Sequence, residues 1–251
     1  FFDPRLVTAL DTATKERMPR SRQPYTHQLA AWKAAKEGLS CLVTSGTGSG
    51  KTECFMLPML DDLLNDPAQG KLDGSRAIVV YPLNALIESQ RERLSAWTEQ
   101  LSDRITFALY NRDTPEIPKQ QKRILSAAEI GDRKTLRARP PSILITNVTM
   151  LEYLLLRHAD QPVLAQSQGL LRWIVLDEAH SYIGAQAAEM ALLLRRVRNA
   201  FGVAPEQVRV MATSATISDG GKAETHSKLE DFIASLAGTD KEQVRVIHGV
   251  E

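Results

Sequence analysis

Short apolar runs alternate along the chain with longer segments in which apolar residues recur every three or four positions. The short runs carry few charges, as is typical of strands that are covered on both faces. They predict seven strands, at Leu39–Thr44, Arg76–Tyr81, Ile105–Leu109, Ser142–Ile145, Arg172–Leu176, Val208–Ala212 and Val244–Ile247. The longer segments predict six helices, at Gln28–Glu37, Lys51–Leu64, Asn84–Gln100, Val148–Arg157, Ala185–Ala200 and Lys228–Ala237.

The alternation of strands and helices predicts an α/β fold of three layers, with a central, mainly parallel sheet and helices on both of its faces. Residues 111–141 interrupt this rhythm, because they hold four prolines and eight Lys or Arg residues against four Asp or Glu residues. We interpret this segment as a solvated, partly helical connection. A surface that faces nucleic acid is the alternative, since the local net charge is +4.

The whole chain is nearly neutral, with 31 basic and 30 acidic residues among 251, so any prediction of nucleic-acid binding must rest on particular residues. No apolar run reaches the roughly 18 residues that a membrane-spanning helix needs, and we therefore expect no membrane partner. Cys41 and Cys54 stand among apolar residues and indicate small buried hydrophobes of a reduced, cytoplasmic protein. The start, FFDPRLVTAL, has neither an initiator Met nor a signal-peptide pattern, so we expect a piece of a longer chain.

Candidate chemistry begins directly after the first predicted strand, where the sequence reads SGTGSGKT. This segment consists of Ser45, Gly46, Thr47, Gly48, Ser49, Gly50, Lys51 and Thr52, and a predicted helix follows it. Glycines let the backbone turn its N–H groups inward, and the helix adds the positive end of its dipole, so that an anion site results. The context predicts a phosphate loop for ATP, in which Lys51 contacts the β- and γ-phosphates and Thr52 ligates Mg²⁺.

A second signal follows the predicted strand Arg172–Leu176, which ends in Asp177-Glu178-Ala179-His180. In a parallel sheet the carboxyl ends of the strands form the edge at which ligands bind. We therefore expect Asp177 to hold Mg²⁺ and Glu178 to polarise the water that attacks the γ-phosphate. Two carboxylates beside phosphates are electrostatically costly unless a metal or a proton offsets their charge, and this cost favours a catalytic role.

Taken in order, SGTGSGKT, DEAH and Ser214-Ala215-Thr216 resemble the first RecA-like domain of the superfamily 2 DEAD/DEAH-box helicases. Four further blocks are similar to motifs of that family, namely PYTHQ at 24–28, YPLNALIESQ at 81–90, YNRDTP at 110–115 and ILITNVTMLEYLLL at 143–156. The stretch that begins DEAHSYIG is similar to the form found in Lhr-like and MrfA-like helicases. The resemblance covers about three quarters of the chain, from Pro24 to Thr216.

The resemblance implies roles for individual residues. Gln28 would hydrogen-bond adenine, with Tyr25 or Arg22 packing nearby. His180 would bond Ser214 or Thr216 and so couple the nucleotide to the nucleic-acid face. The residues implied in contacts with the nucleic-acid backbone are Pro82, Asn84, Thr146 and Asn147. Arg112 stands where the family has Gly in its Tyr-x-Gly-Asp-Thr-Pro block, which puts the usual tight turn in question and adds a cation.

The implied function is that of the ATP-binding motor domain of an ATP-dependent helicase, with ATP and Mg²⁺ as cofactors and a role in DNA repair or defence suggested by the branch alone. We expect an N-terminal extension over 1–23 and this domain over 24–251, with the second RecA-like domain absent.

The expected partners are that second domain and nucleic acid, DNA ahead of RNA, although no residue indicates a contact to the 2′-OH. We expect a monomer that is associated with the nucleoid when engaged. Two alternatives stay open. One is a translocase that moves along double strands without separating them, and the other is a binding module whose affinity for nucleic acid is switched by a nucleotide.

Overall fold

A computed structural model of the chain describes residues 1–46, 48–82, 84–118, 124–182, 185–215 and 222–249, without the side chains of 84–86, 185 and 222–225. The chain divides into two compact units. The first unit comprises Phe1–Gln23 and Leu60–Leu171, and the second comprises Pro24–Met59 and Arg172–Glu251. Helix α3 (Lys51–Leu64) passes from the second unit into the first at Leu60.

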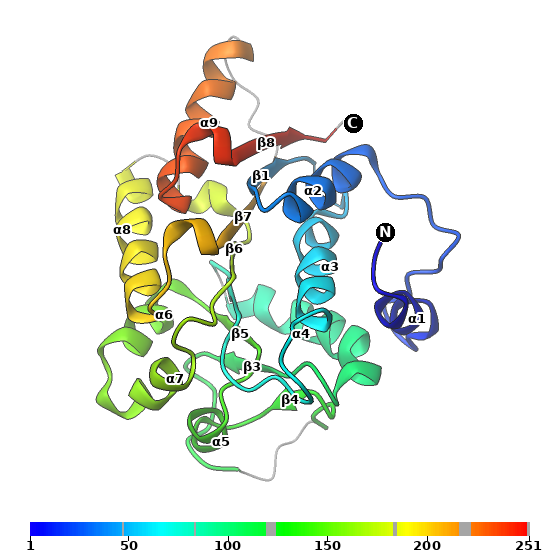
Figure 1. The fold of residues 1–251 in the computed structure, drawn as a ribbon, viewed down its shortest axis with the longest axis vertical. Helices are drawn as coiled ribbons and strands as arrows, with labels where there is room; N and C mark the ends of the chain where they lie inside the picture. Colours follow the sequence, from blue (N-terminus) through cyan, green and yellow to red (C-terminus); the bar gives the residue numbers. More distant parts are fainter. Residues whose placement is uncertain (47, 83, 119–123, 183–184, 216–221, 250–251) are drawn as a thin grey trace. The chain divides into compact units, whose positions relative to one another are not determined.

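The second unit is built on a parallel sheet with the strand order β6-β7-β1-β8 (Figure 1). These strands are β1 (Ser40–Thr44), β6 (Trp173–Leu176), β7 (Arg209–Ser214) and β8 (Val244–His248). The helices of this unit, apart from the start of α3, are α2 (Thr26–Lys36), α8 (Ala185–Ala200) and α9 (Lys222–Ala237). Strands β1 and β6 are buried along their whole length, and α2 and α9 pack against β1 and β8. A phosphate loop at the end of β1 therefore starts from a rigid strand.

The first unit has its own parallel sheet, with the strand order β4-β3-β5-β2. Its strands are β2 (Ala77–Val80), β3 (Phe107–Tyr110), β4 (Glu129–Ile130) and β5 (Ile143–Thr146). Its helices are α1 (Pro4–Thr12), α4 (Asn84–Thr98), α5 (Arg133–Ala138), α6 (Val148–Leu156) and α7 (Gln161–Gln166). Short 3₁₀ turns lie at Glu99–Leu101 and His158–Asp160 in this unit, and at Ala179–Tyr182, Pro205–Gln207 and Lys241–Gln243 in the second.

The α/β class with parallel sheets is confirmed, and so are all seven predicted strands and six predicted helices. Helix α9 begins at Lys222, six residues before its predicted start at Lys228. Four elements were not predicted, namely α1, β4, α5 and α7. Helix α1 has a recognisable start, because the Asp3 side chain accepts a hydrogen bond from the Arg5 N–H (2.8 Å) and Pro4 occupies its first position.

The segment 111–141 is partly helical, as predicted, because it contains α5, but its C-terminal half is packed into the core rather than solvated. Ala128 and Leu136 are completely buried, and the Arg91 guanidinium forms a bidentate ion pair with the Glu129 carboxylate at 2.7 and 2.8 Å. Single apolar residues among charges leave no periodic pattern, which is why the sequence did not reveal this packing. Residues 119–123 of the same segment lie outside the described residues.

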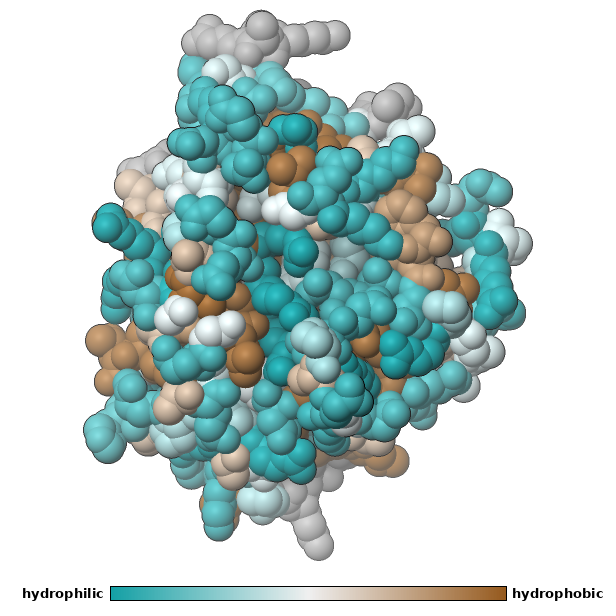
Figure 2. Space-filling model, viewed as in Figure 1, coloured by the Kyte–Doolittle hydropathy of each residue, from teal (hydrophilic) through white to brown (hydrophobic). Residues whose placement is uncertain are grey.

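Both cysteines are buried and unpaired, as predicted. Burial raises the pKa of the Cys41 thiol to about 12 and raises that of Cys54 as well, so both behave as apolar groups at neutral pH. On the face drawn in Figure 2, hydrophilic residues predominate and hydrophobic ones form separate patches. Within the described ranges, no helix has the length and apolar character needed to cross a membrane.

Candidate functional site

The loop between β1 and α3 has the backbone that an anion site requires. Gly48 and Gly50 have φ values of +76° and +77°, in the left-handed region that residues with a Cβ rarely adopt. The Ser45 N–H donates to the Ser214 carbonyl on the neighbouring strand β7 at 3.3 Å, and the Ser49 hydroxyl donates to the Gly46 carbonyl at 2.8 Å. These two bonds hold the described part of the loop, and Thr47 lies outside the described residues.

Lys51 lies within the curve of this loop. Its ammonium donates to the carbonyls of Ser45 and Gly46, at 2.9 Å each, and the residue is only 8% exposed. Thr52, the predicted Mg²⁺ ligand, is 9% exposed on the first turn of α3. The described partners of the Lys51 ammonium are neutral carbonyls of the loop. Phosphate oxygens carry negative charge, so they would replace these carbonyls with stronger hydrogen bonds. The residues present therefore fit a bound triphosphate.

Helix α2 braces the loop from the side. The Gln28 amide nitrogen donates to the Gly50 carbonyl at 3.0 Å, and the His27 Nε2 lies 3.0 Å from the Ser49 carbonyl. The ring of Tyr25 is half exposed and stacks on that of His27, with centroids 5.5 Å apart and an angle of 9° between the planes. The predicted adenine reader Gln28 is completely buried and already bonded to the phosphate loop.

The acidic pair follows β6, which pairs with β7, the strand that ends at Ser214. The Thr213 hydroxyl on β7 donates to the Asp177 Oδ1, and the Glu178 N–H donates to the same oxygen at 3.1 Å. Burial raises the pKa of Asp177, as does the neighbouring Glu178 carboxylate, while the bond from Thr213 and the Lys51 ammonium lower it. A cation placed beside Asp177 would relieve the cost of its buried charge.

A stability prediction follows from the raised pKa of Asp177. The folded chain holds the proton of the Asp177 carboxyl more tightly than the unfolded chain, in which the aspartate pKa is near 3.8. Between pH 3.8 and the folded pKa, the folded chain therefore binds more protons than the unfolded chain. The contribution of Asp177 to the free energy of unfolding falls as the pH rises through this range. Without Mg²⁺ and nucleotide, Asp177→Asn should raise the free energy of unfolding at pH 7 by about 0.5–2 kcal/mol. Urea unfolding measures this gain, which should shrink towards zero below the unfolded pKa. The exposed Asp240→Asn is the control, and a loss of stability in Asp177→Asn at pH 7 would contradict the prediction.

Glu178 has a φ of +53°, and a side chain in this left-handed region is strained. The carboxylate Oε2 of Glu178 lies 3.1 Å from the His180 Nδ1. The predicted bond from His180 to Ser214 is not the one that the structure describes, since the Ser214 hydroxyl donates to the Ala215 carbonyl at 3.0 Å. Thr216, the other predicted partner, lies outside the described residues. The link from the acidic pair to β7 runs through Thr213 instead.

The predicted nucleic-acid contacts belong to the first unit and differ in how accessible they are. Thr146 is completely buried, and its hydroxyl donates to the Tyr110 carbonyl at 2.7 Å, so it faces the sheet rather than solvent. The Asn147 side chain caps α6 by accepting a hydrogen bond from the Met150 N–H at 2.9 Å. Pro82 is partly exposed, and the side chain of Asn84 is not described. Arg112 is exposed, and its turn is made by Asn111, whose Oδ1 accepts from the N–H groups of residues 113 and 114 at 3.0 Å.

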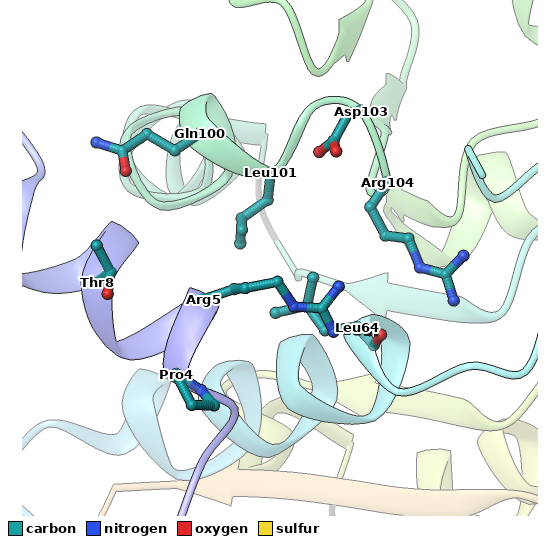
Figure 3. Close-up of a pocket in the computed structure, with 8 residues that line it drawn as sticks. All are labelled: Pro4, Arg5, Thr8, Leu64, Gln100, Leu101, Asp103 and Arg104. Carbon is teal, nitrogen blue, oxygen red and sulfur yellow. Dashed lines mark hydrogen bonds between the residues drawn. The ribbon is translucent and has the colours of Figure 1, made fainter. Parts of the chain in front are cut away.

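A pocket of about 370 Å³ lies between α1 and the turn after α4 in the first unit (Figure 3). It is lined by Pro4, Arg5, Thr8, Leu64, Gln100, Leu101, Asp103 and Arg104. Arg5 is paired with Asp3 at 2.8 Å and also donates to the Leu64 carbonyl at 3.0 Å. Arg104 donates to the Gly70 carbonyl at 2.7 Å and to those of Asp66 and Ala68. Both guanidinium groups therefore hold neighbouring stretches of the chain together at the wall of this pocket.

Three residues of the site were not predicted from the sequence. Thr213 binds the candidate metal ligand, His27 contacts the phosphate loop, and Glu53 is a buried carboxylate on the first turn of α3. Glu53 had a visible signal, since it is a charge at the start of the otherwise apolar stretch TECFMLPML. The other two had none, because their roles depend on contacts with distant segments.

The loop and its buried lysine follow β1, and the acidic pair follows β6, two strands of one parallel sheet that flank β7. This arrangement is typical of a P-loop nucleoside-triphosphatase site. The model of the DEAD/DEAH box helicase family matches residues 25–223. The chain belongs to this family.

Three relatives show how much of a longer protein such a chain represents. The Druantia protein DruE of Escherichia coli is 25% identical, with 91% of this chain and 18% of that protein aligned. The Lhr helicase/probable uracil glycosylase of Mycolicibacterium smegmatis is 30% identical over 76% of this chain and 12% of its own length. A crystal structure of the DUF1998 helicase MrfA bound to DNA and AMPPNP is 25% identical, with a TM-score of 0.68 over 98% of this chain and 29% of that one. The chain therefore spans less than a third of these proteins.

Proposed function

We propose that this chain is the ATP-binding motor domain of a helicase that couples hydrolysis of Mg-ATP to movement along DNA and separation of its strands. The observation that carries the proposal is the convergence of three segments at one edge of the second unit's sheet. The phosphate loop follows β1, Asp177 and Glu178 follow β6, and Thr213 and Ser214 end β7, which lies between those two strands. The carboxyl ends of parallel strands are where nucleotides bind in such folds.

Each residue has a task in this proposal. Lys51 and the loop amides bind the phosphates and offset their charge, and bound ATP with Mg²⁺ supplies the phosphoryl group that is transferred to water. Thr52 and Asp177 would be the two protein ligands of Mg²⁺. Two are enough because this ion usually keeps several water ligands and also binds the phosphates of its substrate. In the described part of the chain there is no cluster of three or more His, Cys, Asp or Glu residues able to hold a metal. Glu178 accepts a proton from the attacking water, and His180 holds the Glu178 carboxylate in place.

DNA is the nucleic acid we propose, because the MrfA structure is described as bound to DNA. The first unit offers a surface for it on α6, where the Arg157 guanidinium lies 4.4 Å from the centre of the exposed Tyr153 ring. An aromatic ring with a cation beside it suits stacking on bases of any sequence. We propose that Asn147 and this pair contact a single strand, and that the chain acts as a cytoplasmic monomer with a second RecA-like domain as its partner.

The test is ATP binding and turnover by these 251 residues with Mg²⁺, alone and with single- or double-stranded DNA or RNA. We expect ATP to bind while its turnover stays slow with every polymer, because a second domain supplies an arginine worth about 10³–10⁵ in rate in such motors. Failure to bind ATP would overturn the proposal. Strong stimulation by RNA alone would overturn the assignment of DNA.

A further inference from the structure

Glu53 places a buried carboxylate oxygen beside the phosphate loop. The residue lies in the first turn of α3 and is 6% exposed, and its Oε2 atom is buried with no hydrogen-bond partner among the described residues. The Trp32 indole N–H donates to the backbone carbonyl of Glu53 at 2.9 Å. A buried acceptor without a donor is destabilising, so a donor is expected to arrive with a ligand.

The neighbour of this carboxylate is Gln28. A Cβ atom built on Gly50 would lie 2.4 Å from the Gln28 Nε2 and 3.0 Å from the Glu53 Oε2, so both groups meet at the backbone of Gly50. The Gln28 oxygen accepts a hydrogen bond from the Tyr25 N–H at 3.0 Å, and its nitrogen donates to the Gly50 carbonyl at 3.0 Å. The amide therefore has a second N–H to offer, while its oxygen is turned towards the Tyr25 backbone.

We propose that Glu53 reads the base of the nucleotide beside Gln28, whose contact with adenine the family resemblance already implies. Glu53 would accept a hydrogen bond from the exocyclic amino group of adenine, while Gln28 donates to a ring nitrogen. An ionised carboxylate only accepts, and adenine presents an amino group beside a ring nitrogen on its outer edge. Guanine presents a carbonyl oxygen at the place of that amino group, and this oxygen would face the carboxylate. The pair thus selects adenine nucleotides over guanine nucleotides.

This inference rests on the proposed function. It adds to that function a role in base selection for Glu53, a residue outside the glutamine motif. For a purely structural buried carboxylate we would expect a donor to each oxygen, whereas no described residue donates to the Glu53 Oε2. The position also suits the task, because the Glu53 side chain stands on the turn that carries Lys51 and Thr52.

The experiment compares the affinities of ATP, GTP and purine riboside triphosphate, which is ATP without the amino group. For the unchanged chain we expect ATP to bind about tenfold or more tightly than either of the others, the usual effect of leaving a buried polar group unpaired. In Glu53→Leu the affinity for ATP should fall about tenfold and that for purine riboside triphosphate should not fall. Glu53→Gln keeps an acceptor oxygen and should keep the preference for ATP.

Several outcomes separate this inference from the proposed function. Equal affinities of ATP and purine riboside triphosphate for the unchanged chain would overturn the role of Glu53 while leaving nucleotide binding intact, and this result needs no variant to fold. An equal loss of both ligands in Glu53→Leu would also overturn it, because it would show a structural role. The absence of binding by all three nucleotides would overturn the proposed function itself. Glu189→Leu, at an exposed position on α8, is the matched control and should change none of the affinities.

Discussion

Replacing Lys51 with alanine is expected to weaken ATP binding by about 100-fold or more while the chain stays folded. The Lys51 ammonium is buried, and its only described hydrogen bonds are to the loop carbonyls of Ser45 and Gly46. Two charge-assisted bonds to phosphates in such a site are worth about 3 kcal/mol together, which corresponds to roughly 100-fold in affinity. Titration with a fluorescent ATP analogue measures the loss.

The control for this prediction must separate lost contacts from lost structure. Thermal unfolding followed by circular dichroism should show a shift of only a few degrees for Lys51→Ala, because the strands beside the loop keep their pairing. The control variant is Lys241→Ala. The Lys241 side chain is 44% exposed and its described partners are Asp231 and Ser227, so this variant should bind ATP normally. Unchanged ATP affinity in Lys51→Ala would mean that the loop does not hold the phosphates.

Glu178→Gln should lower the rate of ATP hydrolysis by about 10²–10⁴-fold while ATP binding changes little, because the amide keeps the shape of the side chain but cannot take a proton from water. Glu178 is the residue after the buried Asp177, and its carboxylate is oriented by His180 at 3.1 Å. Its left-handed backbone, with a φ of +53°, aims the side chain differently from an ordinary strand residue.

Hydrolysis by the unchanged chain is expected to be slow, so the measurement should be a single turnover of labelled ATP with the protein in excess. Glu189→Gln supplies a control, because it makes the same chemical change at an exposed position on α8. A variant that binds ATP poorly would indicate a role for Glu178 in binding, and a variant that hydrolyses at the normal rate would exclude it as the base.

The elements that the sequence predicted well are those with long or strongly apolar patterns. The phosphate loop lies between β1 and the start of α3, as the alternation of strands and helices predicted. Its signal, glycines between a strand and a helix, is contained within a few consecutive residues and can be read without knowledge of the fold. Three of the four missed elements, β4, α5 and α7, span six residues or fewer, and the buried residue of α5 is Leu136. Such residues are recognisable as core only once the chain that covers them is known.

The partners of the site residues were harder to predict than the residues themselves. His180 was expected to bond Ser214 or Thr216. It lies against Glu178, the Ser214 hydroxyl donates to the Ala215 carbonyl, and Thr216 is outside the described residues, while Thr213 links Asp177 to β7. Strand register explains the difference, because Leu176 pairs with Ala212, so that the next residues along the two strands, Asp177 and Thr213, face each other. A shift of one residue in that register would bring a different hydroxyl to the carboxylate.

The sequence by itself determined the α/β class, the order of the main elements, the phosphate loop and the acidic pair, since each of these rests on short-range backbone chemistry. Only the tertiary structure decided three hydrogen bonds of the site residues. The Thr213 hydroxyl donates to the Asp177 carboxylate, the Gln28 amide donates to the Gly50 carbonyl, and the Thr146 hydroxyl donates to the Tyr110 carbonyl. These pairs join residues 36, 22 and 36 positions apart. A hydrogen-bond partner at such a separation is chosen by which strands and helices pack side by side, and that choice is made by the whole core.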